Sequence, residues 1–86
     1  MVIVVIRFQT LDEYLDHVLI KVEEENIRPY EVMAIKATIR GLSVNRDIDW
    51  LYRLLKLLNQ MKLYHLLPSR YEIEEWIKRK EIKVRI

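Results

Sequence analysis

The hydrophobic and polar residues of this chain recur with two different periods, and these periods predict helices flanked by two strands. Residues 2–6 form an unbroken run of β-branched side chains, which predicts a strand that is apolar on both faces. Residues 82–86 alternate strictly between apolar and basic side chains, which predicts a half-exposed strand. We expect these two terminal strands to pair with each other.

Between the strands, apolar residues recur at helical spacing in four segments. The first helix is expected to begin after Thr10, which has the spacing of a capping box, and to end near Asn26, because Pro29 cannot lie in a helix interior. The second helix is expected over residues 30–40. Gly41 follows it and is the natural left-handed residue with which to end it.

The third helix is the longest one expected, from about residue 46 to residue 66. Its polar residues fall on one narrow stripe, and nearly all of its other residues are apolar, so we expect it to be central to the core or covered by another chain. Pro68 ends this run. Ser69 and Glu72 have the spacing of a second capping box, which predicts a fourth helix to about Lys80. The stripe consists of Arg46, Asp49, Arg53, Lys56 and Gln60.

The expected fold is therefore α+β and mostly helical, in the order β-α-α-α-α-β, as a single domain over residues 1–86. A two-stranded sheet is marginal alone, so we expect a second chain to cover or extend it. An alternative for residues 62–75 is a hairpin that turns at Pro68 and Ser69, as in a winged helix. The capping-box spacing favours the helix.

The composition changes this picture mainly by exclusion. The chain has no Cys, two His and one Gly, which excludes disulfides, thiolate metal sites and Gly-rich phosphate loops. No nucleophile is paired with a base. We therefore expect no enzyme activity, no cofactor, no metal and no small-molecule substrate. The abundance of Ile, Leu, Lys, Arg and Glu resembles that of thermophile proteins.

The N-terminal residues do not read as a targeting segment. Residues 1–6 are apolar but lack the basic leader and the length of a signal peptide. No apolar run reaches the roughly 20 residues that a membrane-spanning helix needs. We therefore expect a cytoplasmic protein without membrane contact.

The charge is distributed unevenly, although the net charge is only +2. Residues 10–31 carry seven acids and two bases, whereas residues 32–70 carry seven bases and two acids. Such an asymmetry indicates either a face that attracts polyanions or two faces that attract each other across an interface.

One motif within the basic segment adds a functional hypothesis. Ala37 is followed after three residues by Gly41, Leu42 and Ser43, and this pattern resembles the turn of helix-turn-helix DNA-binding proteins, including winged ones. The resemblance covers residues 37–55. It implies that the small residue and the Gly let two helices pack closely, and that Ser43 begins a recognition helix.

The pattern departs from the family in one place. The first inward residue usually stands six positions after the Gly, but Asp47 occupies that position and Ile48 follows it, so the turn needs one more residue. The resemblance implies a small homodimeric transcription regulator that contacts the bases and phosphates of duplex DNA. The alternative is a non-catalytic protein-interaction or assembly module without nucleic-acid contact. The candidate DNA contacts are Lys36, Arg40, Ser43, Asn45, Arg46, Arg53 and Lys56.

Overall fold

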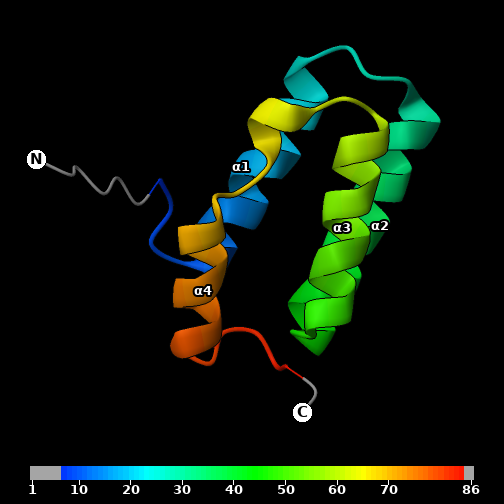
Figure 1. The fold of residues 1–86 in the computed structure, drawn as a ribbon. Coiled ribbons are helices and arrows are strands. Elements are labelled where there is room, and N and C mark those ends of the chain that lie inside the picture. The colour runs from blue at the N-terminus through cyan, green and yellow to red at the C-terminus, as the bar shows by residue number, and fades with distance from the viewer. Residues whose placement is uncertain (1–6, 85–86) are drawn as a thin grey trace, which may run out of the picture.

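Four α-helices and one short 3-10 helix account for the regular structure in the computed structural model, which describes residues 7–84. α2 and α3 lie side by side and run in opposite directions, and α4 lies on the side of α1 (Figure 1). Within residues 7–84 there is no strand, and Asp47 and Lys83 form an isolated bridge. The elements are α1 (Leu11–Glu24), α2 (Pro29–Asn45), α3 (Ile48–Gln60), η1 (Tyr64–Leu66) and α4 (Arg70–Lys78).

The expected α+β fold with paired terminal strands is wrong, because the described chain is all-α. The first expected strand, residues 2–6, lies outside the described residues. In the second, Ile82 packs into the helical core and is 2% exposed. The N–H of Lys83 donates to the carbonyl of Arg46 at 2.6 Å, and its carbonyl accepts from Ile48 at 3.0 Å. Of the predicted apolar face, Ile82 is thus held by the helices, whereas Val84 is 45% exposed.

The predicted caps of α1 and α4 are confirmed. The Thr10 hydroxyl accepts from the N–H of Glu13 at 3.1 Å, whereas the Glu13 carboxylate accepts from the N–H of Gln9 instead of Thr10. At α4, Ser69 and Glu72 form the complete capping box, with bonds of 3.1 and 3.2 Å. The fourth helix is therefore present in place of the winged hairpin.

α2 is longer than predicted, because it does not end at Gly41. It begins with Pro29 in its first turn and continues to Asn45, and the left-handed residue after it is Arg46, with a φ of 51°. Gly41 lies inside the helix against the indole of Trp50. A Cβ atom there would lie 2.3 Å from a ring carbon, so Gly41 is required by the close packing of α2 on α3.

α3 is shorter than predicted, because it begins at Ile48 and ends at Gln60. Asp47 is its N-cap, and its carboxylate accepts from the N–H of Asp49 at 3.0 Å. After α3, Lys62 has a φ of 60°, which interrupts the expected long helix before η1. The left-handed conformation of Lys62 also turns the chain toward α1.

The core lies where α1, α2 and α3 meet, and α4 and the tail close it. Trp76 of α4 and Tyr14 of α1 are fully buried, and their ring centroids are 5.3 Å apart. The Tyr14 hydroxyl donates to the carbonyl of Leu66 at 2.8 Å, which attaches α1 to η1. Burial raises the pKa of Tyr14 far above its usual value, with the charge of Glu72 as a second cause, so the hydroxyl keeps its proton.

Gly41→Ala is expected to destabilise the protein, although Ala normally stabilises a helix interior by about 1 kcal/mol relative to Gly. The added methyl group would overlap the Trp50 ring, and overpacking a core costs about 1–3 kcal/mol. Urea unfolding followed by circular dichroism should therefore give a lower free energy of unfolding.

The control is the same substitution in a Trp50→Leu background. Without the indole, Gly41→Ala should be neutral or stabilising, because the helix propensity of Ala then dominates. If Gly41→Ala stabilises the wild-type chain, the ring does not approach α2 this closely.

Candidate interaction surface

The outward face of α2 is an apolar ridge. Tyr30, Met33 and Val44 are 63%, 70% and 78% exposed, and Ala37 is exposed between them. Successive spacings of three, four and seven residues place all four on one side of the helix. Grouped apolar side chains that stay in water are typical of a contact surface. We call Tyr30, Met33, Ala37 and Val44 the α2 ridge.

Basic side chains border the α2 ridge on both sides. Lys36 and Arg40 lie on the side toward α1, where they line a shallow groove with residues of that helix. Arg53 and Lys56 of α3 lie on the other side, where they line a hollow with Thr38 of α2. A partner that fits this surface therefore has apolar residues at its centre and acids at its edges.

A small hollow lies on the α2 ridge itself. It is lined by Met33, Lys36, Ala37 and Arg40, which are spaced i, i+3, i+4 and i+7. Four residues with this spacing form the hole that receives one side chain of a facing helix in knobs-into-holes packing. The short side chain of Ala37 leaves the space at its centre.

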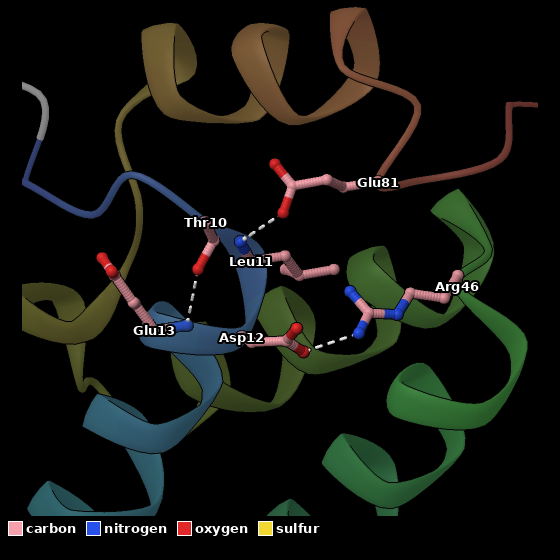
Figure 2. Close-up of polar contacts among 6 residues, drawn as sticks. All are labelled: Thr10, Leu11, Asp12, Glu13, Arg46 and Glu81. Atoms are coloured by element: carbon pink, nitrogen blue, oxygen red, sulfur yellow. Dashed lines mark hydrogen bonds and ion pairs between the residues drawn. The ribbon is translucent and has the colours of Figure 1, made fainter.

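Two of the predicted DNA contacts instead hold α2 against α1. Lys36 Nζ lies 2.5 Å from Glu23 Oε1. A guanidinium nitrogen of Arg46 lies 2.6 Å from Asp12 Oδ1, as Figure 2 shows. The acidic and basic segments of the sequence therefore partly neutralise each other inside one chain.

Arg46 belongs to a junction at the start of α1. Figure 2 shows its side chain reaching Asp12 from the turn between α2 and α3, while Glu81 reaches the first residue of α1 from the tail. The Glu81 carboxylate accepts from the N–H of Leu11 at 3.0 Å. Arg46 is therefore a structural residue in this chain.

Ser43 and Asn45 lie in the last turns of α2, so neither begins a recognition helix. The Asn45 side chain donates to the carbonyl of Gly41 at 2.9 Å. The predicted position of the turn, at residues 41–43, is wrong. The connection consists of Arg46 and Asp47, and the two helices run antiparallel as a helical hairpin, whereas helix-turn-helix pairs cross at about 90–120°.

Arg40, Arg53 and Lys56 are the predicted contacts that remain on the surface. All three are exposed, and none forms an ion pair with another residue of the described part of the chain. The Arg53 guanidinium lies over the Trp50 ring, 4.7 Å from its centroid. In this cation–π arrangement the ring attracts the positive charge of Arg53. The outward polar stripe of α3 is thus present, without Arg46.

The α2 ridge was not predicted from the sequence. The apolar residues of α2 that face the core are Ile35, Ile39 and Leu42, which are buried. The missed signal was a second apolar row on the opposite side, beginning at Tyr30 and Met33. A helix with two apolar faces indicates a second contact besides the core.

We also searched the described residues for a metal site and for a membrane-spanning helix. In the described residues, no three His, Cys, Asp or Glu side chains are placed to hold a metal ion, and no helix there is long and apolar enough to cross a membrane. Comparison with protein-family models, curated proteins and solved structures finds no match for this chain.

His17→Gln is expected to reduce the loss of stability in mild acid. Nε2 of His17 is buried without a hydrogen-bond partner in the described residues. Burial, Arg7 and Lys21 lower the pKa of His17, and Glu24 and Glu25 oppose this shift. The folded state therefore binds fewer protons than the unfolded state, so stability is lost as the pH falls through about 6.5 and below.

Thermal unfolding at pH 8 and pH 5 measures this effect, and the decrease in Tm should be larger for the wild type than for His17→Gln. The matched control is the other histidine: His65→Gln should leave the contribution of His17 in place. Equal losses in the wild type and His17→Gln would contradict the prediction.

Proposed function

We propose that this chain is a non-catalytic protein-interaction module that binds an acidic amphipathic helix along the α2 ridge. The exposure of Met33 and Val44, 70% and 78%, is the observation that supports the proposal. Full burial of an apolar side chain of this size contributes about 1.5–3 kcal/mol. A partner that covers the ridge would gain this free energy.

The shape of the surface favours a helix over a small ligand. The hollows beside the ridge are shallow and open, whereas small-molecule sites are concave and bury most of their ligand. Residues spaced i, i+3, i+4 and i+7 match the anchors of a helix laid along a helical surface.

The charges favour an acidic partner. Lys36 and Arg40 border one side of the ridge, and Arg53 and Lys56 border the other. Carboxylates at both edges of a partner helix would meet a cation on each side, which fixes its orientation and accelerates encounter.

Photo-crosslinking tests this proposal in the cells that make the protein. With p-benzoylphenylalanine in place of Val44, which lies on the α2 ridge outside the hollow and is 78% exposed, irradiation is expected to give a covalent adduct with a protein, identified by mass spectrometry. The matched control carries the same group in place of Tyr71, which is 41% exposed on α4, and should give none. No protein adduct at position 44, or equal adducts at both positions, would count against the proposal.

Duplex DNA is the second candidate partner, and the open stripe of α3 favours it. Arg53, Lys56, Asn59 and Gln60 are all exposed. Cations of this kind neutralise phosphates, and amides reach base edges. The contact would lie along the middle of α3 instead of at its start. We rank this candidate second, because the neighbouring Met33 finds no favourable partner among phosphates.

Fluorescence anisotropy with duplex DNA at low salt tests the second candidate. The double variant Arg53→Ala/Lys56→Ala should weaken binding and lower the slope of log K against log salt by about 2, because two phosphate contacts are lost. The control Arg70→Ala/Lys78→Ala removes the same charge from α4 and should leave the slope unchanged. Absence of binding at low salt, or equal losses in both variants, would remove this candidate.

A further inference from the structure

The outward face of α1 has the inverse pattern of the α2 ridge. Asp12, Asp16 and Glu23 are exposed, and Ile20 among them is 55% exposed. Spacings of four, four and three residues place these side chains on one side of the helix. The chain therefore carries both the α2 ridge, which is apolar with basic borders and a hole, and an acidic helix face from which one apolar side chain projects.

Two ion pairs set the relative height of α1 and α2. Glu23 meets Lys36 near one end, and Asp12 meets Arg46 near the other, because the helices run antiparallel. Ile20 lies three residues from Glu23, so its height along the bundle is within about one helical turn of the hole on α2.

We infer that the acidic helix bound by the α2 ridge is α1 of a second copy of this chain. The inference rests on the proposed function and names its partner. A two-fold axis parallel to the helices places α1 of each copy over α2 of the other and preserves their heights. The four helices then form a bundle in which every neighbour is antiparallel, and the same contact is made twice.

Charge disfavours the other symmetric pairings. If α2 lay on α2, Arg40, which forms no ion pair within residues 7–84, would approach the cations of the other copy, and if α1 lay on α1, Asp16 would approach the acids of the other copy. Like charges across an interface cost several kcal/mol. When α1 lies on α2, Asp16 of one copy approaches Arg40 of the other, and Ile20 approaches the hole beside Ala37.

The size of the face sets the expected strength of the dimer. α1 has 14 residues and α2 has 17, so the helices are about 21 and 25 Å long. A face of two such helices is at the small end of stable interfaces, which bury about 800 Å² per partner. We therefore expect a reversible dimer with a micromolar dissociation constant.

Sedimentation equilibrium of the full chain from about 1 µM to about 1 mM tests the inference. Dimer formation should depend on concentration and weaken in 1 M NaCl, because ion pairs contribute to it. Arg40→Glu and Asp16→Arg should each raise the dissociation constant about tenfold or more. Neither side chain has a hydrogen bond or ion pair within residues 7–84, so the fold of each variant should be retained, which circular dichroism verifies.

A mixture of Arg40→Glu and Asp16→Arg provides the decisive measurement. In the mixed dimer one α1–α2 contact is unchanged and the other carries a reversed but attractive pair, so association should return to the wild-type value. Tyr71→Glu, on α4, should leave association unchanged. Failure of the mixture to associate more tightly than either variant would overturn the α1–α2 arrangement.

The two proposals fail in distinguishable ways. A chain that stays monomeric at 1 mM overturns the second copy as the partner. In that case, an adduct between position 44 and a different protein would still support the proposed function. The absence of any protein adduct at position 44 would remove both.

Discussion

The close contact between Gly41 and the Trp50 indole is the constraint on which the remaining architecture depends. A side chain at Gly41 would hold α3 away from α2, and the two helices could not form a tight hairpin across a connection of only Arg46 and Asp47. Because α3 packs against the side of α2 that carries Gly41, and α1 packs against another side, the α2 ridge faces water. The absence of a side chain at Gly41 thus determines which residues of α2 are exposed to a partner.

Much of the helical part of the fold was predictable, because the signals for it are local. Thr10 and Ser69 begin their helices as the sequence indicates, since a cap depends on residues only three positions apart. Gly41 misled the prediction, because a left-handed helix end and a close helix contact both require Gly, and only the position of Trp50 distinguishes them. The prediction of a strand at residues 82–86 was wrong for a related reason. Alternation indicates that Ile82 is buried on one side, but it does not distinguish packing against another strand from packing against a pair of helices.

The candidate surface was predictable only in part. The sequence identifies the cations of α2 and α3, but the pairing of Lys36 with Glu23 and of Arg46 with Asp12 depends on how α1 packs. Those pairs remove two expected contacts and leave Arg40 exposed. The ridge was missed because the periodicity of α2 is weak, as expected when apolar residues lie on opposite sides of a helix.

The turn between α2 and α3 also holds both the first turn of α1 and the tail after α4. The tail bonds to the backbone of Arg46, and the side chain of Arg46 bonds to the first turn of α1. Loosening this turn therefore releases three segments together, so local opening here should be a single cooperative event instead of independent fraying. The first turn of α1 and the tail at residues 82–83 should consequently be as protected from exchange and proteolysis as the hairpin to which they are attached.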